Sequence, residues 1–519
     1  MTDKIVKNLN FGDDAKDKIL KGVEKLTKAV SSTLGASGQC VILEDNTGKP
    51  VITKDGVTVA NSITLLDPVE NIGATLIKQA AQRTVSEAGD GTTTATVLAH
   101  AILEKAYKAL KSHGSRNLKE GINSGVDKII KYLESNAIEV SDGMIDHVAT
   151  ISANNDAVLG KIISDAFKSV DKTGIVIMQE TDNPNTSVEL VDGLQYDKGL
   201  KSHHFITNKD SDSAVLDKPL VLIVESKIPN IRRIQNILEY VIKNKRALLI
   251  IADVEAQVLN TLAMNKVKGN LNVNIIDLPT YGVNRKEIAM DLAMMTGAKI
   301  INEELGDDMD FINPEFLGEC IRATTTNEET ILQVDKKTKE IEETIKSIQL
   351  DLEKPSFANI RVRLEKRLAR LTAKMAIVKV GANSEVELKE KKDRVEDAIC
   401  ATKAAIKEGI VPGGGIALLN ATQRLKPTNE GEKILYEAAK APFKTILKNA
   451  GIDEYEEPSS KGKGLNVVTK GMVHMVKSGI IDPLLVTKSA LRNAASVATT
   501  ILSTDCVINN LRVGDEGSR

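Results

Sequence analysis

The chain has 519 residues, a formal net charge of −2, 27% charged residues and only 3% aromatic residues. This length allows several domains and a large core, whereas the lack of a basic stretch and of stacking side chains argues against nucleic-acid binding. No apolar run reaches the roughly 18–20 residues of a membrane helix, and the N-terminus lacks a signal-peptide pattern, so we expect a cytoplasmic protein without membrane contact. The four cysteines lie far apart without C-x-x-C spacing, which argues against zinc and disulfides.

The N-terminal part is predicted to be mainly helical. Residues 13–34 carry apolar side chains at helical spacing, and the segments "CVILED" and "PVITKD" flank the turn "NTGK", which predicts a β-hairpin. Helical patterns follow at about 70–88, 93–111 and 118–134.

The middle of the chain changes character. Four short apolar segments are separated by helical patterns, which predicts a parallel sheet covered by helices: "PLVLIV" (219–224), "ALLIIA" (247–252), "VNII" (273–276) and "KII" (299–301). The loops after these strands contain no G-x-G-x-x-G, and the chain has no G-x-x-x-x-G-K-[ST]. These absences argue against a dehydrogenase with a dinucleotide fold and against a P-loop kinase.

The last third is again predicted to be helical. Two apolar runs within residues 338–376 predict an antiparallel helical hairpin, and a long helix is expected at about 384–408. The glycine-rich segment "VPGGG" then precedes a mainly helical C-terminal segment. Helical regions therefore flank a central α/β insert.

The stretch "GDGTTTAT" (89–96) opens a predicted helix and contains an unexpected aspartate. Glycine-rich turns at helix starts bind anions, because the free N–H groups and the helix dipole favour negative charge. Asp90 would repel a phosphate unless a cation lay between them, so it predicts a Mg²⁺ ligand, with the following threonines binding phosphate. The alternative is an ordinary helix N-cap without a ligand.

Three further glycine-bearing turns have the same two interpretations. They are "TLGASG" (33–38), "TKDG" (53–56) and "VPGGGIALL" (411–419). Each suits close approach of the backbone to a ligand, and each taken alone is also typical of an ordinary turn or helix end.

Taken together and in this order, these motifs resemble those of the group I chaperonins, the GroEL family. The resemblance extends from Phe11 to Asn509 and is carried by the following segments: "TLGASG", "VITKDG", "GDGTTTATVLA", "TISAN", "YDKGLKSHHF", "VEDAICATKAAIKEGIVPGGG" and "GIIDP". It implies an ATP-hydrolysing chaperone whose subunits form rings and enclose unfolded proteins. A ring that binds clients with little productive ATP turnover is the alternative.

The resemblance implies a multidomain fold of the α plus α/β class. The helical equatorial ATP domain would comprise residues 1–136 and 409–519, and the small intermediate hinge domain residues 137–190 and 374–408. The inserted α/β apical domain would comprise residues 191–373 and hold the client protein.

The resemblance also implies a site for ATP, Mg²⁺ and K⁺. Asp90 would bind Mg²⁺, Lys54 would contribute to the K⁺ site, and Asp55 and Asp397 would orient the attacking water. Asp397 also has a simpler interpretation as a solvated surface acid of a charged helix. The remaining nucleotide contacts would be Thr33, Leu34, Gly35, Gly91, Thr92, Thr93, Thr94, Gly414, Asn466 and Asp482.

Clients would bind to an apolar groove of the apical domain, although its members would instead be core residues of the α/β fold under the alternative interpretation. The expected groove consists of Leu200, His204, Phe205, Gln235, Leu238, Leu259, Ala263 and Met264. The implied partners are unfolded proteins, the other subunits of a seven-membered ring and a GroES-type co-chaperonin. Residues 111–113 and 449–464 depart from the family text, which leaves a single ring or a weak double ring open.

Overall fold

The computed structural model divides the chain into two compact units. Unit 1 consists of Met1–Asp165, Met178–Ser187 and Lys379–Arg519, and unit 2 consists of Ala166–Ile177 and Val188–Val378. The two ends of the chain therefore build one unit, and the middle builds the other. The structure describes residues 7–44, 48–153, 155–170, 175–181, 183–196, 198–208, 212–278, 283–334, 339–353, 364, 367–368, 371–372 and 374–510.

Unit 1 is mainly helical, as predicted. Its elements are β1 (Lys7–Phe11), α1 (Gly12–Ser31), β2 (Val41–Glu44), β3 (Pro50–Thr53), α2 (Gly56–Ser62), α3 (Pro68–Ala88), α4 (Thr92–His113), α5 (Ser115–Ser135), α6 (Asp142–Ser152), α13 (Glu385–Glu408), β15 (Ile410–Pro412), α14 (Ile416–Arg424), α15 (Glu430–Ala438), α16 (Ala441–Asn449), β16 (Lys463–Asn466), β17 (Gly471–His474), β18 (Ile481–Pro483), α17 (Leu484–Leu502) and β19 (Cys506–Asn510). The predicted hairpin is β2–β3, whereas the C-terminal segment expected to be mainly helical also contains short strands.

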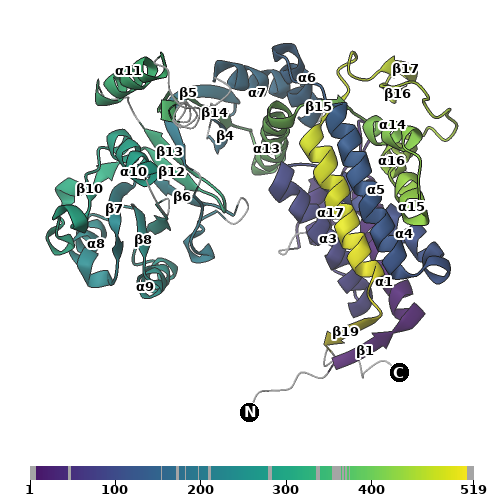
Figure 1. The fold of residues 1–519 in the computed structure, drawn as a ribbon, viewed down its shortest axis with the longest axis horizontal. Coiled ribbons are helices and arrows are strands. Elements are labelled where there is room, and N and C mark those ends of the chain that lie inside the picture. The colour runs from purple at the N-terminus through teal and green to yellow at the C-terminus, as the bar shows by residue number, and fades with distance from the viewer. Residues whose placement is uncertain are drawn as a thin grey trace. The chain divides into compact units, whose positions relative to one another are not determined.

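The core of unit 1 lies between long helices. α17 packs against α3, α4 and α5, which lie beside it in Figure 1. α1 and α3 cross so closely that a side chain at Gly22 or Gly73 would collide with the backbone of the other helix. Residues at this crossing can only be glycine, which explains two glycines inside helices despite their cost of about 1 kcal/mol each.

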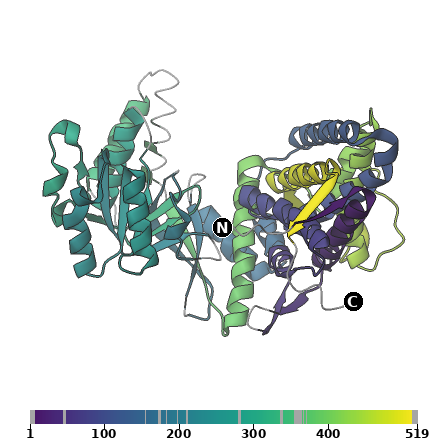
Figure 2. The ribbon, with the colours of Figure 1, turned by 90° about the horizontal axis from the view of Figure 1, so that it is seen from below.

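The two ends of the described chain form one antiparallel ribbon. β1 pairs with β19 in the register Leu9↔Ile508, and Figures 1 and 2 show β19, in yellow, beside β1, in purple. The side chains of Leu9 (51% exposed), Phe11 (60%) and Ile508 (58%) remain open to solvent. Sequence periodicity did not predict this ribbon, because its strands are separated by almost the whole chain.

Unit 2 contains the predicted α/β insert. Its main elements are η1 (His203–Phe205), β6 (Ala214–Asp217), β7 (Leu220–Ile228), η2 (Ile231–Ile234), α8 (Gln235–Lys243), β8 (Leu248–Val254), α9 (Ala256–Val267), β9 (Val273–Ile276), α10 (Val283–Thr296), β10 (Ile300–Ile301), β11 (Gly318–Glu319), β12 (Arg322–Thr325), β13 (Thr330–Val334) and α11 (Lys339–Glu353). The four predicted strands form a parallel sheet in the order β10-β7-β8-β9, and β11 is added antiparallel to β7.

Both faces of this parallel sheet are covered. Along β7, Leu222 and Val224 point into one core with α8 and α9, whereas Val221 and Ile223 point into a second core with α10 and α11. Burial on both faces explains why the strands read as continuous apolar runs rather than as alternating patterns.

A second sheet was not predicted. It has six strands in the order β4-β14-β5-β13-β12-β6, with β4 (Ile175–Glu180), β5 (Ser187–Tyr196) and β14 (Lys374–Val380). Helix α7 (Ala157–Ser169) precedes it. Of the helical hairpin expected at 338–376, α11 is present, and most of the second arm lies outside the described residues. No described helix combines the length and apolarity needed to span a membrane.

Candidate functional site

The aspartate of the "GDG" stretch lies in a tight turn between α3 and α4. Gly89 and Gly91 have φ angles of 72° and 94°, a left-handed conformation that other residues adopt only with strain. Gly91 is the N-cap of α4, and no side chain caps this helix. The first N–H groups of α4 are therefore available to an anion, as expected for a phosphate site.

Two other predicted turns lie against the start of α4. The hydroxyls of Thr33 and Thr93 are 3.5 Å apart, and a side chain at Gly56 would come within 2.4 Å of the Thr93 hydroxyl. Thr92 is 6% exposed. Turns from residues 33–35, 53–56 and 89–94 thus meet at one place.

The turn at residues 33–35 is held from α16. The side-chain amide of Asn449 donates to the carbonyl oxygens of Ser31 at 2.8 Å and Leu34 at 2.9 Å. Gly35 has a φ of 86° and faces Ile446, which a side chain at this position would approach to 3.1 Å. These contacts fix the backbone that was expected to line a ligand.

Two of the predicted carboxylates stand in this junction. Asp55 caps α2, where its side chain accepts from the N–H groups of Val57 at 3.1 Å and Thr58 at 2.7 Å. Burial raises the pKa of Asp90, the hydrogen bond from the Gly91 N–H opposes this, and the negative charge of Asp55 raises it further. Asp90 therefore lies where a positive charge would stabilise its ionised form.

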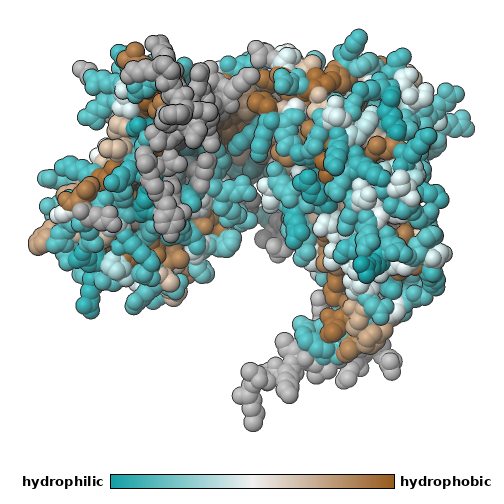
Figure 3. Space-filling model, in the orientation of Figure 1, coloured by the Kyte–Doolittle hydropathy of each residue, from teal (hydrophilic) through white to brown (hydrophobic). Residues whose placement is uncertain are grey.

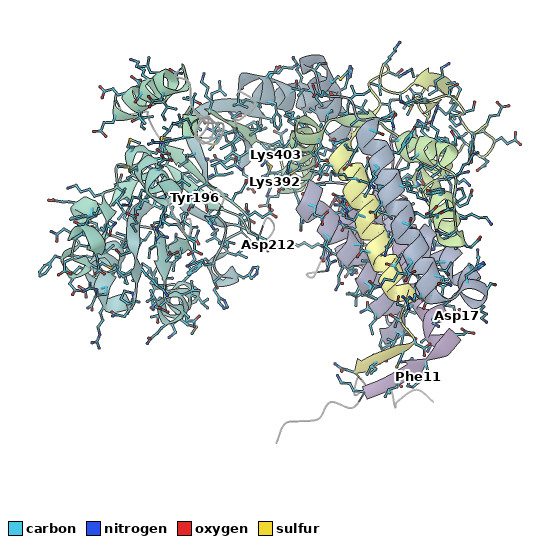
Figure 4. All side chains as sticks on the ribbon, in the orientation of Figure 1. Phe11, Asp17, Tyr196, Asp212, Lys392 and Lys403 are labelled. Carbon is cyan, nitrogen blue, oxygen red and sulfur yellow. The ribbon has the colours of Figure 1, made fainter. Side chains whose placement is uncertain are left out.

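Helix α13 adds two more carboxylates. Burial and the charges of Asp90 and Asp55 raise the pKa of Asp397 well above its usual range. Asp397 is partly buried, so it is not fully solvated as the simpler interpretation would have it. Asp393, one turn earlier, was not predicted, and burial and the charge of Asp55 raise its pKa to about 6. Figure 4 shows Lys392 and Lys403 along this helix.

Asp482 approaches the same cluster from β18. Burial and the charge of Asp90 raise the pKa of Asp482 to about 7, although the Gly414 N–H donates to its carboxylate. Val411 of β15 pairs with Asp482 in the sheet register, so the "PGGG" segment and Asp482 are neighbours. Asn466, by contrast, turns to its own hairpin and accepts from the N–H groups of Val468 and Thr469.

Lys54 directly precedes Asp55 in the chain and lies within reach of the charge of Arg394. Burial lowers the pKa of Lys54, and the charge of Arg394 lowers it further. Arg394 itself lies 4.0 Å from Asp156. The charges of Lys389 and Lys392 act on Asp393, where they lower its pKa against the larger effect of burial.

The donor chemistry fits a magnesium–phosphate ligand. Carboxylate and hydroxyl oxygens are the donors that Mg²⁺ prefers, and the cation usually keeps one or two carboxylates together with phosphate oxygens and water. Among the described residues, no group of three or more His, Cys, Asp or Glu side chains is close enough to hold a metal ion. A cation at Asp90 would therefore need ligands from a bound phosphate or from water.

A comparison with protein families shows which family the chain belongs to. The family model described as the TCP-1/cpn60 chaperonin family matches residues 26–512. The chain belongs to this chaperonin family. Two solved structures of the chaperonin gp146 from the bacteriophage EL 2 (Pseudomonas aeruginosa), both in the presence of ATP-BeFx, resemble the chaperonin. Crystal form II has a TM-score of 0.71 and 22% identity, covering 98% of this chain and 100% of that chain; for form I the values are 0.64, 22%, 97% and 99%.

The expected client groove of the chaperonin is only partly exposed. Phe205 (0% exposed), Leu238 (8%) and Ala263 (4%) lie in the core with α8, α9 and the parallel sheet. These three side chains are therefore core residues, as the alternative interpretation predicted, because the inner faces of η1, α8 and α9 cover the sheet. Leu200 and Leu259 are partly buried against this core, whereas His204, Gln235 and Met264 are exposed.

The chaperonin also exposes apolar residues that the sequence analysis missed. Val267 follows Met264 on α9 and is 63% exposed, and Ile242 on α8 is 50% exposed. Their positions relative to the buried residues of the same helix place them on its outer face, and this spacing could have identified them from the sequence.

Proposed function

We propose that this chaperonin hydrolyses ATP in unit 1 and uses the cycle to capture non-native proteins in a ring cavity and assist their folding. The observation that carries the proposal is the uncapped N-terminus of α4 beside Asp90, Asp55, Asp397 and Asp482. Family membership supports it, as does the similar phage chaperonin gp146, whose crystal structure was determined in the presence of ATP-BeFx.

Each part of the turn region has a chemical task in this proposal. The N–H groups and hydroxyls of Thr92, Thr93 and Thr94 bind the phosphates, and Asp90 binds Mg²⁺. Bound Mg²⁺ neutralises phosphate charge and polarises the phosphoryl group. Asp397 accepts the proton of the attacking water, for which a raised pKa makes its carboxylate a more effective base.

The other expected contacts complete the nucleotide pocket. Asp55 orients the water from the start of α2, and the fixed backbone of residues 33–35 faces the nucleotide with Gly91 and Gly414. Asp482 accepts hydrogen bonds from ribose hydroxyls, and Asn466 lies towards the base. The K⁺ site involves Lys54 through its backbone carbonyl, because an ammonium group cannot bind a cation.

Phosphate release from the purified chaperonin tests the catalytic part. Asp397→Ala should slow turnover by about 100-fold and leave ATP binding nearly intact, since it removes a proton acceptor. Asp90→Ala should instead weaken binding of MgATP. Wild-type turnover by Asp397→Ala would refute its assignment, and client capture without phosphate release would favour the binding-only ring.

Domain roles follow from the same proposal. We assign residues 1–136 and 409–519 to an equatorial domain, 137–190 and 374–408 to an intermediate domain, and 191–373 to an apical domain. Clients bind the exposed side of the apical domain at Leu200, His204, Gln235, Leu259 and Met264, extended by Val267.

Two apolar ribbons in unit 1 support assembly into rings. Ile42 (71% exposed) and Ile52 (55%) face each other across β2 and β3, as Leu9 and Ile508 do across β1 and β19. Figure 3 shows brown, apolar side chains at the end of unit 1 where β1 and β19 lie in Figure 1. Exposed apolar pairs on short, open-edged ribbons favour contacts between subunits. We propose rings of seven subunits and a GroES-type co-chaperonin as partner.

A further inference from the structure

Helix α13 contacts the "GDG" turn through a residue that the proposed chemistry does not use. A side chain built on Gly89 would meet Cβ of Cys400 at 2.2 Å and its Sγ at 2.8 Å. Cys400 therefore fills the space above Gly89, and its side chain packs directly on the backbone of the turn. The positive φ of Gly89 and this contact both exclude any larger residue there.

The surroundings make Cys400 a packing residue rather than a reactive one. Ala88, Ala404 and Val486 form a small buried cluster at the junction of α3, α13 and α17. Burial, together with the charges of Glu396 and Asp397, raises the pKa of the Cys400 thiol to about 12. The thiol thus stays neutral near pH 7, where only a thiolate would be nucleophilic.

The contact links two residues of the proposed site. Cys400 follows Asp397 by three positions on α13, so the two side chains share one side of the helix. Gly89 directly precedes Asp90. We propose that Cys400 is a positioning residue: its size sets how closely Asp397 approaches the Asp90 turn. This inference rests on the proposed ATPase activity, since it concerns the distance between Asp397 and the Asp90 turn in that reaction.

A size series at position 400 tests the proposal by steady-state phosphate release. Cys400→Ser preserves the volume and should keep turnover within about 2-fold of wild type. Cys400→Ala leaves a gap and Cys400→Leu pushes α13 away, so each should lower kcat by about 10-fold, because small displacements of reacting groups are costly. The half-saturating MgATP concentration should change by less than about 3-fold, since phosphate and metal ligands remain. Cys320→Ala is the matched control, because Cys320 is a buried thiol in unit 2.

A second background separates positioning from general damage. In Asp397→Ala protein there is no carboxylate to place, so adding Cys400→Ala should cause no further loss of turnover. If both Cys400→Ala and Cys400→Leu turn over like wild type, or if Cys400→Ala lowers the rate equally in both backgrounds, the inference is overturned.

Hydrogen exchange supplies a readout that does not need turnover. In nucleotide-free protein, Cys400→Ala should accelerate exchange of the peptide containing residues 86–95, where the N–H groups of Gly89 and Ala95 bond to Val85 and Gly91. Unchanged exchange there would overturn the contact's role even if the ATPase exists. If Cys400→Ala exchanges faster than wild type there but the wild-type protein releases no phosphate, the contact is retained and the proposed ATPase is refuted.

Discussion

Replacing Asp482 by asparagine should stabilise the ligand-free chaperonin at alkaline pH. Burial and the charge of Asp90 raise the pKa of Asp482 from 3.8 to about 7. A carboxyl with a raised folded-state pKa stabilises the fold below pH 4, and this stabilisation is lost as the pH rises through 7. Asparagine carries no charge and keeps an oxygen that accepts from the Gly414 N–H, so it resembles the protonated acid.

The size of the effect follows from the pKa. A pKa shift from 3.8 to about 7 corresponds to a loss of about 4 kcal/mol in the free energy of unfolding at pH values above 7. Because Asp482 is only partly buried, we expect solvent screening to leave about 2 kcal/mol for Asp482→Asn at pH 8. The gain should shrink steadily between pH 7 and pH 4.

Thermal unfolding in chelator without nucleotide, from pH 5 to pH 9, measures this difference. Asp505→Asn is the control, because its side chain is 85% exposed and its removal should change stability by less than about 0.5 kcal/mol. The reasoning is refuted if Asp482→Asn melts at or below the wild-type temperature at pH 8. It is equally refuted if the gain is the same at pH 5.

Three further predictions concern stability, clients and assembly. Burial raises the pKa of Glu432, but hydrogen bonds from Lys128, Thr428 and Ser124 outweigh burial and lower it to about 2. Glu432→Gln should therefore lower the free energy of unfolding by about 2–3 kcal/mol near pH 7, and by progressively less below pH 4.5, as measured by thermal unfolding. Met264→Ser should reduce protection of a denatured client in an aggregation assay without lowering the melting temperature. Phe205→Ser should instead destabilise unit 2 by about 3 kcal/mol or more, as measured by thermal unfolding. Ile508→Asp should shift sedimentation towards smaller species, because it places a charge in the exposed apolar pair; unchanged sedimentation would exclude the ribbon from the subunit contact.

Local patterns predicted the parts of this structure that local chemistry determines. Glycine positions and the "GDGTT" order indicated the turn before α4, and continuous apolar runs indicated strands buried on both faces. Asp67 and Pro68 begin α3 as a cap and a first helical residue, a start signal that is readable without the fold.

Long-range pairing and burial could not be predicted in the same way. β1 pairs with β19 across nearly the whole chain, and no periodicity in either segment names its partner. Phe205 lies in a segment of only three helical residues, too short for a pattern to distinguish its inner from its outer side. Gly89 and Cys400 are ordinary residues in their own segments, and only the packing of α13 on the turn makes them a pair.

The proposed site brings together carboxylates that repel one another, so its construction opposes stability. Asp90 lies in the turn before α4, Asp397 on α13 and Asp482 on β18. The pKa of each is raised by burial and by the charge of another carboxylate, which is Asp55 for Asp90 and Asp90 for the other two. A site of this kind is most costly when it lacks cations, and a bound magnesium nucleotide would remove much of the repulsion. In the proposed function, binding of MgATP would stabilise unit 1 by RT ln(1 + [L]/Kd), and the electrostatic attraction of the ionised carboxylates for the metal would enter through a lower Kd as the pH rises. In the proposed function, the same charges that make the empty site unfavourable would favour the metal-bound nucleotide over the free one.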